Sequence, residues 1–233
     1  MSAGGDLLAC KARHDLLNGP GKSDLIISHA SAHVQGPYGG FSPNPVQTAM
    51  ILSLFKRSSG AKTARSLYGD VVRQARQPAF YGAGGVADTE DGRYDLILLH
   101  MFLVLERLNR VSPEPVQLKQ DLFDVLFEDL DLNLREMGFG DEGVRRRIQR
   151  MVEGFYGRMT AYREGLTGGE GALEGALRRN LYRNVTPPDA AVGRLAGYVR
   201  AQTASLAALG DADLLAGRVA FTGPEWAPEG DGQ

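Results

Sequence analysis

The chain has 233 residues and a formal net charge of −2, from 26 lysine and arginine residues against 28 aspartate and glutamate residues. This length suits one compact domain with tails, and so balanced a charge gives no reason to expect DNA as a partner. The single cysteine, Cys10, excludes a disulfide framework and a metal site of several thiolates.

The first 49 residues differ from the rest in composition. Glycine and proline recur throughout residues 1–49, and only one short apolar patch interrupts them. This composition is typical of a disordered N-terminal extension. Met50 then opens an apolar patch followed by Lys56 and Arg57, a pattern typical of a natural protein start. Residues 1–49 can therefore be interpreted as a start-site artefact, and residues 50–60 as a short flexible lead-in.

Targeting signals and membrane spans are not predicted. The longest apolar run, Leu96 to Leu105, has about half of the roughly 20 residues that a helix needs to cross a bilayer. Asp6 interrupts the N-terminal segment, and Arg13 is the only arginine before Arg57, which matches neither a secretory signal nor a transit peptide. We therefore expect a cytoplasmic protein.

The patterned part of the chain starts with two predicted helices. Apolar residues at helical spacing in residues 67–75 predict the first helix, which Pro78 ends. Asp88 or Thr89 is expected to cap the second helix. Residues 94–108 of that helix are apolar on almost every side, which indicates a central helix with neighbours all round.

Two long helices and a short one are predicted next. Residues 118–137 carry apolar side chains along one face, and residues 144–166 show the cleanest amphipathic pattern in the chain. We expect Asp141 to cap the second of these helices. A shorter helix is predicted over residues 173–181, after a glycine-rich turn.

The last long helix is predicted over residues 192–206, where Thr186 and Asp189 resemble a capping box at its start. No stretch shows convincing strand alternation. We therefore expect an all-α fold, a single-domain bundle of about six or seven helices over residues 61–221. Residues 222–233 are predicted to form a flexible C-terminal tail.

Acidic residues gather on one predicted helix, over residues 121–131. Carboxylates spaced by three or four residues are used by all-helical prenyl-transfer enzymes, in which Mg²⁺ ions hold a diphosphate between two facing acidic clusters. Here only Glu170 and Glu174 could form a second cluster, and a solvated acidic face is the favoured interpretation. A Mg²⁺-dependent prenyl-transfer enzyme is kept as the alternative function, and no metal, cofactor or catalytic residue is assigned. The acidic residues are Asp121, Asp124, Glu128, Asp129 and Asp131.

His100 is the only histidine of the patterned region, and it lies within the central helix. A general base or a haem ligand is imaginable there. No partner residues for either role are visible, so a core histidine that is hydrogen-bonded to a neighbouring helix is favoured.

The helix over residues 144–166 is rich in arginine. Guanidinium groups bind carboxylates and phosphates, so these side chains could face RNA or an acidic protein, or could pair with the preceding acidic helix. Both interpretations stay open. The arginines are Arg145, Arg146, Arg147, Arg150, Arg158 and Arg163.

Small residues on the same helix predict a surface for a partner. Small side chains allow another helix to approach closely, although glycine lowers helix stability. We predict a partner-docking groove at Gly154 and Gly157, rimmed by Arg146 and Arg150. The alternative is that the small residues pack against the last helices of the chain itself. The small residues are Gly143, Gly154, Gly157 and Ala161.

Several segments, taken in order, resemble the ubiquinol-cytochrome c chaperone family over most of residues 60–210. They are RQARQPAFY at 73–81, DTEDGRYD at 88–95, the apolar segment around His100, DLFDVLFEDLDLNLREMG at 121–138 and GFYGR at 154–158. The resemblance implies a helical, non-enzymatic assembly factor for the cytochrome bc1 complex, and the absence of a transit-peptide pattern suggests a bacterial-type member.

The resemblance also implies partners. The client would be newly made cytochrome b or another bc1 subunit, and mitochondrial members work with a small partner chaperone near the ribosome. For this chain the resemblance implies a place in the cytoplasm, with peripheral contact with the inner membrane or the ribosome. No client-binding residue is carried over from the family.

Overall fold

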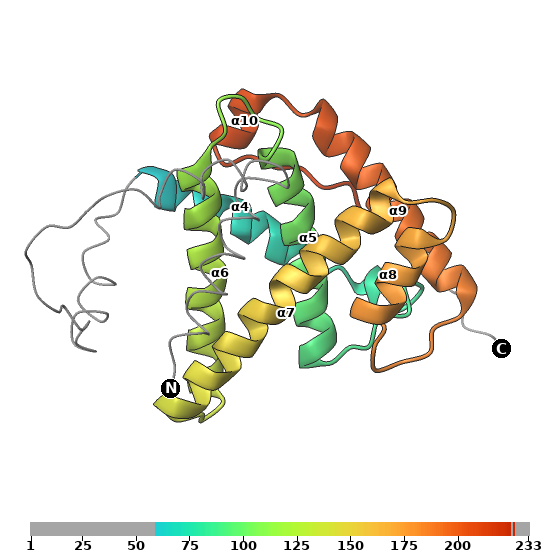
Figure 1. Ribbon diagram of the computed structural model, residues 1–233, viewed down its shortest axis with the longest axis horizontal. Helices are drawn as coiled ribbons and strands as arrows, with labels where there is room; N and C mark the ends of the chain where they lie inside the picture. The colour runs from blue at the N-terminus through green and yellow to red at the C-terminus, as the bar shows by residue number, and fades with distance from the viewer. Residues whose placement is uncertain (1–58, 225, 227–233) are drawn as a thin grey trace, which may run out of the picture.

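The computed structural model describes residues 59–224 and 226, and every regular element in this part of the chain is helical (Figure 1). The expected all-α fold is confirmed, with seven α-helices and one short 3-10 helix over the described residues. The predicted N-terminal extension, 1–49, and nearly all of the lead-in lie outside the described residues. The elements are α4 (Ser59–Ala75), η1 (Pro78–Phe80), α5 (Glu90–Leu108), α6 (Val116–Glu136), α7 (Asp141–Thr167), α8 (Ala172–Asn180), α9 (Asp189–Ala208) and α10 (Asp211–Leu215).

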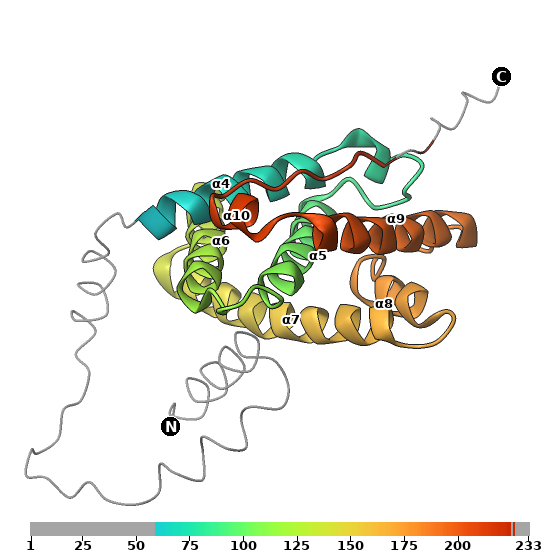
Figure 2. The same ribbon diagram turned by 90° about the horizontal axis from the view of Figure 1, so that it is seen from above.

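Helix α5 occupies the centre of the molecule, as its sequence predicted. It contacts α4, α7 and α9, and Figure 2 shows it between α4 on one side and α7 on the other. No helix among residues 59–224 is long and apolar enough to cross a membrane.

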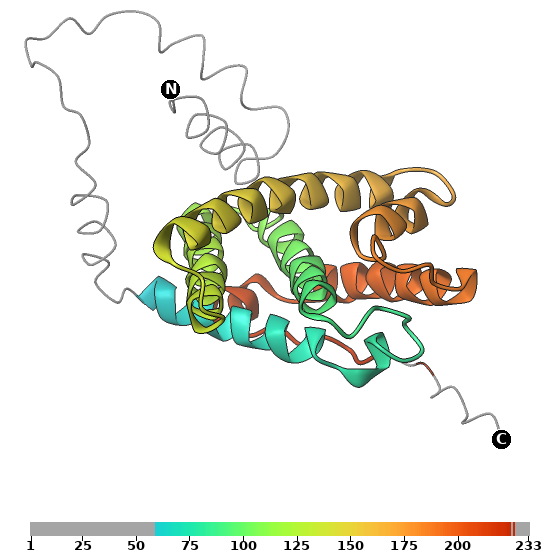
Figure 3. The same cartoon turned by 90° about the horizontal axis from the view of Figure 1, so that it is seen from below.

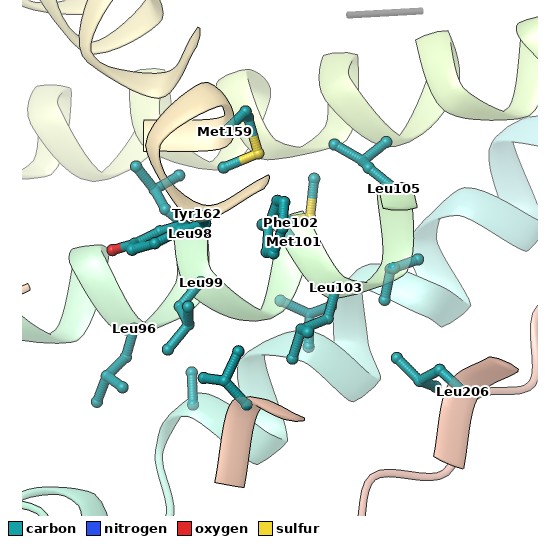
Figure 4. Packing of buried hydrophobic residues seen from close by; sticks show 14 of the residues in the cluster. Leu96, Leu98, Leu99, Met101, Phe102, Leu103, Leu105, Met159, Tyr162 and Leu206 are labelled. Atoms are coloured by element: carbon teal, nitrogen blue, oxygen red, sulfur yellow. The ribbon is translucent and has the colours of Figure 1, made fainter. Parts of the chain in front are cut away.

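Apolar side chains leave α5 in every direction and enter the core (Figure 4). Phe102 packs near Tyr162 of α7, with ring centroids 5.6 Å apart, and Leu206 of α9 lies in the same cluster. Each fully buried side chain of this size stabilises the fold by about 1.5–3 kcal/mol relative to an exposed one. The labelled α5 residues of the cluster are Leu96, Leu98, Leu99, Met101, Phe102, Leu103 and Leu105.

The start of α5 is capped by Thr89, as predicted. The Gly92 N–H donates a hydrogen bond to Thr89 Oγ1 at 3.2 Å. A Cβ atom at position 92 would lie 2.0 Å from the Ala87 carbonyl oxygen, so only glycine allows the loop to approach the helix this closely.

Two other predicted caps are wrong. Gly140 is the N-cap residue of α7, and Asp141 is the first helical residue, where its charge interacts with the positive end of the helix without a capping bond. The capping box at Thr186 does not form either, because Pro188 is the N-cap of α9 and no side-chain capping bond is present. Asp189 instead pairs with Arg178 at the end of α8.

A buried arginine of α5 determines where α9 ends. Arg107 is only 7% exposed, and its Nε–H donates to the Leu206 carbonyl at 2.8 Å. The same guanidinium donates to the Leu209 carbonyl at 2.6 Å and pairs with Asp211. Carbonyls at a helix C-terminus lack partners within the helix, and Arg107 supplies them here.

After α10 the chain turns back along α4 in an extended conformation (Figures 2 and 3). We call this segment, residues 217–224 with Trp226, the strap. Burial alternates along it: Val219 is buried and Phe221 is half-buried, whereas Ala220 and Thr222 are exposed. Such alternation is typical of an extended segment that lies on a surface.

A flexible tail was predicted over residues 222–233, but Thr222 and Trp226 are part of the strap. Thr222 is hydrogen-bonded to Gln202 of α9, and Trp226 packs edge-on against Phe80, with ring centroids 5.6 Å apart. Both residues belong to the packed part of the molecule because side chains of the helices supply their contacts. Residues 225 and 227–233 lie outside the described residues.

Gly165 is the small residue through which α7 packs against α8. A Cβ atom at this position would lie 2.9 Å from Leu173 Cα and 3.3 Å from Ala176 Cβ, whereas a Cβ at Gly157 would meet nothing within 4 Å. Packing of small residues against the later helices of the chain therefore occurs at Gly165, which the sequence analysis did not select.

We expect opposite effects of alanine at these two glycines. Gly165→Ala should lower the free energy of unfolding by about 1–3 kcal/mol, because the added methyl group pushes α8 away from α7. Gly157→Ala should raise it by about 0.5–1 kcal/mol, because alanine favours an exposed helical position. Urea unfolding followed by circular dichroism measures both changes, and equal effects would contradict the assigned packing.

Candidate interaction surface

The four predicted docking residues lie together on the outer face of α7. Their spacing places them within an arc of about 80° around the helix axis. They are Arg146, Arg150, Gly154 and Gly157. Arg146 is exposed over 71% of its side chain, and Arg150 and Gly157 are exposed as well. Figure 1 shows α7 crossing the front of the molecule.

The predicted groove is interrupted at Gly154. Arg158 Nη1 donates to the Gly154 carbonyl at 3.0 Å, and a Cβ at Gly154 would lie 2.7 Å from the same nitrogen. The Arg158 side chain therefore covers Gly154, which is half-buried. Gly157 keeps open space above it, so close approach by a partner is possible there.

The arginines of α7 have partners on α7 itself and on α5. Arg145 pairs with Glu142 at 2.7 Å, and Arg146 pairs with the same carboxylate at 3.3 Å. Arg163 Nε–H donates to Glu106 of α5 at 2.9 Å. Pairing with the preceding acidic helix is therefore wrong for these arginines, since closer carboxylates lie one turn away or on α5.

The start of α7 presents arginine beside exposed apolar side chains. Arg147 lies over the Phe139 ring, 3.9 Å from its centroid, a geometry that allows cation–π attraction. Leu132 and Met137, at the end of α6, are 56% and 51% exposed. The corner between α6 and α7 thus exposes apolar side chains together with arginines, of which Arg135 and Arg145 pair with Asp141 and Glu142.

The acidic residues of α6 are spread over several partners. Tyr68 of α4 donates to Asp129 at 2.8 Å, and burial together with this bond raises the pKa of Tyr68. Glu128 pairs with Arg65 of α4 at 3.4 Å, and Asp131 pairs with Arg135 at 2.7 Å.

This spread does not provide a diphosphate clamp. Among the described residues, no group of three histidine, cysteine, aspartate or glutamate side chains could hold a metal ion. Asp121 and Asp124 accept bonds from Gln117 and Gln120 of their own helix. The alternative of a Mg²⁺-dependent prenyl-transfer enzyme is therefore not supported.

A buried ion-pair cluster, which the sequence analysis missed, joins α5 to α7 and to the segment after α8. Asp95 is 1% exposed and accepts from Arg158 Nη2 at 2.9 Å and from Arg183 Nε at 3.1 Å. Burial raises the pKa of the Asp95 carboxyl, and the two guanidinium groups oppose that rise. Burial likewise raises the pKa of the nearby Tyr162.

His100 is a core histidine bound to a neighbouring helix, as predicted. Its Nδ1 lies 2.8 Å from the Leu96 carbonyl, and its Nε2 lies 2.8 Å from the Tyr198 hydroxyl of α9. A carbonyl only accepts hydrogen bonds, so His100 Nδ1 donates to Leu96 and His100 Nε2 accepts from the Tyr198 hydroxyl. The Tyr198 oxygen in turn accepts a hydrogen bond from Gln74 Nε2 at 2.9 Å. Burial lowers the pKa of His100 to about 4, which keeps the ring neutral.

The domain is all-helical, its buried polar residues contact one another or the backbone, and arginines lie on an exposed helix face. These are features of a protein that binds other proteins. Residues 83–221 match the family described as ubiquinol-cytochrome C chaperone, and the chain belongs to this family. It is a family of chaperones and not of enzymes.

Relatives support this assignment. A crystal structure of the Cbp3 homolog from Brucella abortus is 37% identical, covers 75% of this chain and 98% of that chain, and superposes with a TM-score of 0.63. Ubiquinol-cytochrome c reductase complex assembly factor 1 of Mus musculus is 23% identical over 152 residues, which are 65% of this chain and 52% of the mouse protein. The Xenopus laevis protein with nearly the same name is 24% identical over 152 residues, 65% of this chain and 76% of that protein. The chain thus spans about half the length of its mouse relative.

Removing the Asp95 charge should destabilise the protein strongly. Asp95→Asn leaves Arg158 with no carboxylate partner in a nearly buried position, and we expect a loss of about 3 kcal/mol in the free energy of unfolding. Asp88→Asn is the matched control, because the Asp88–Arg93 pair is exposed on both sides and its loss should leave the free energy of unfolding nearly unchanged. Urea unfolding measures both, and similar small losses would contradict a structural role for Asp95.

His100 should make the stability fall at acidic pH. Its folded-state pKa of about 4 lies below the ordinary value of 6.5, so between these values the unfolded chain binds a proton that the folded chain does not. The free energy of unfolding should therefore fall by about 3 kcal/mol from this group as pH decreases from 6.5 to 4. His100→Gln, which cannot titrate, should lose correspondingly less stability than the unaltered chain over this range. If the free energy of unfolding, measured with urea, had the same pH dependence in both chains, His100 would not contribute to the acid destabilisation.

Proposed function

We propose that this protein is an assembly chaperone of the cytochrome bc1 complex, which holds newly made cytochrome b or another bc1 subunit until cofactors and partner subunits arrive. The observation that carries the proposal is the family match over residues 83–221. The vertebrate relatives, which are named as assembly factors of the ubiquinol-cytochrome c reductase complex, support the same task.

The outer face of α7 is the site that we propose for the client or for a small partner chaperone. Arg146 and Arg150 provide exposed guanidinium groups, which suit carboxylates or backbone carbonyls of a partner. Gly157 provides an open position at which another helix could pack without meeting a side chain. Gly154 supports this surface less directly, because Arg158 covers it.

We also propose that the protein works in the cytoplasm at the inner membrane, and that its peripheral contact is the corner between α6 and α7. Exposed Leu132 and Met137 could enter the headgroup region, and Arg147, which lies over the Phe139 ring, belongs to the same corner. Apolar side chains next to basic ones are a common means of binding an anionic membrane surface. A ribosome contact through the same arginines is the other arrangement that fits this corner.

Deletion of the gene tests the proposed task. Membranes of the deletion strain should lose spectroscopic b-type haem and bc1 activity, because unprotected cytochrome b would be degraded before assembly. Other respiratory activities serve as the control. Unchanged b-type haem together with unchanged bc1 activity would overturn the proposal.

Complementation of that strain tests the α7 surface. Gly157→Leu should fold normally and yet restore bc1 activity several-fold less than the unaltered chain, because the leucine fills the space that a partner helix needs. Gly69→Leu is the matched control, since Gly69 is an exposed glycine of α4 with nothing within 4 Å of an added Cβ. Co-purification of cytochrome b should follow the same order. Full activity of the Gly157→Leu chain would exclude this surface.

A further inference from the structure

The strap is held to the helices by side chains. Gln202 Nε2 donates to the Thr222 carbonyl at 3.2 Å and to its hydroxyl, and Gln202 Oε1 accepts from the Thr222 N–H at 3.1 Å. Gln74 of α4 donates to the same carbonyl at 3.0 Å. In the described part of the chain, no backbone-to-backbone hydrogen bond joins residues 219–224 to the helices. The two glutamine side chains thus bind the backbone of the strap, as side chains of a binding protein can bind the backbone of an extended peptide.

Two aromatic side chains of the strap enter an aromatic surface made by the helices and η1. Phe221 lies 5.3 Å from the His100 ring, edge-on, and Trp226 lies 5.6 Å from Phe80 and 6.1 Å from Tyr198 between centroids. Gly84 makes room for the indole, because a Cβ there would lie 2.7 Å from a Trp226 ring carbon. Edge-to-face contacts of this kind stabilise an aromatic pair beyond the effect of the buried area alone.

The groups that receive the strap are neutral. Burial keeps His100 uncharged, and burial raises the pKa of Tyr198, so these two rings offer neutral aromatic contacts while the two glutamines offer hydrogen bonds without charge. An uncharged surface of this kind favours the backbone and aromatic side chains of an extended apolar segment.

The base of the strap is packed against α4 on one side, since a Cβ at Gly217 would lie 3.1 Å from Ser66 Cβ and Val219 is buried in the core, and it is open on the other. An open hollow of about 390 Å³ lies between α4 and residues 217–220, lined also by Ser66, Asp70 and Leu209. The strap is therefore attached at its base by Val219 and farther along by Phe221, Thr222 and Trp226.

We propose that the surface beneath the strap is a binding site for an extended client segment that carries two aromatic side chains and a backbone amide for Gln202, and that the strap occupies this site until the client segment replaces it. This inference rests on the proposed chaperone function. A tethered strap has an effective concentration on the order of millimolar, so a free peptide competes with it poorly. A client segment competes with the strap when the rest of the client is held on the same chaperone, because that attachment raises the effective concentration of the segment in the same way.

A synthetic peptide tests the site. Its sequence is RVAFTGPEW, residues 218–226, and it carries a fluorescent label. The full chain with Phe221→Ser and Trp226→Ser should bind this peptide at least ten-fold more tightly than the unaltered chain does, because its own strap no longer fills the site. Circular dichroism establishes that the helices are intact. Absence of binding to this folded variant, or equal binding to both chains, would overturn the proposal.

Two controls define the contacts. A peptide in which the phenylalanine and the tryptophan are replaced by serine should bind at least ten-fold more weakly. Gln202→Leu, added to the strap-weakened chain, should weaken binding of the original peptide to a similar degree, because the Thr222 backbone loses its partner. Binding that neither change affects would place the peptide elsewhere and would contradict the site.

Hydrogen exchange of the unaltered full chain gives a second test that does not depend on the variants. The Thr222 amide, which is bonded to Gln202, should exchange at least a hundred-fold faster than the amides of α5, because the strap detaches without global unfolding. Exchange of Thr222 only together with α5 would show that the strap does not leave.

The peptide-binding experiments and the gene deletion test the strap site and the proposed assembly function independently. If the gene deletion lowers b-type haem but the peptide does not bind, the strap site is wrong and the assembly task stands. If the peptide binds as expected but the deletion has no effect, the site stands and its client lies outside the bc1 complex.

Discussion

The burial of α5 on every side is the constraint on which the rest of the structure depends. A polar group can be buried at low cost only when it is hydrogen-bonded, and α5 carries three such groups. Asp95 is bonded to α7 and to the segment after α8. His100 is bonded to α9, and Arg107 is bonded to the end of α9. Each of these neighbours is therefore positioned by a specific polar contact as well as by apolar packing, which gives the bundle one arrangement.

Several features that depend on nearby residues could be predicted from the sequence, although the caps at Asp141 and Thr186 could not, and the partners of distant residues could not be predicted at all. The all-round apolar pattern of α5 and the Thr89 cap are local, and both were predicted correctly. The partners of Asp95 lie 63 and 88 residues away, and periodicity carries no information about them. The four residues of the candidate surface were placed on one helix face by spacing, but the cover over Gly154 depends on Arg158, whose position Asp95 sets. The strap was missed because its alternation is short.

The polar residues of this chain fall into two groups with different tasks. Those of α5 inside the bundle are bonded to neighbouring elements: the Nε2 atom of His100, for example, accepts from Tyr198. Those on the outer face of α7, such as Arg146 and Arg150, face solvent, and the buried Gln202 binds the strap through its side chain. This division suits the proposed chaperone task, since a partner bound to the outer face of α7 leaves the buried polar contacts of α5 in place.

The contact between Arg107 and the end of α9 limits how the length of the chain can vary. Insertion of residues into α9 would rotate and shift the Leu206 and Leu209 carbonyls away from the guanidinium and leave a buried charge without partners. The turn between α7 and α8, at Gly168–Gly171, carries no such contact to the core and is exposed. Homologous chains of different length should therefore differ at this turn and not within α9, since the register of the last helix is set from the centre of the domain.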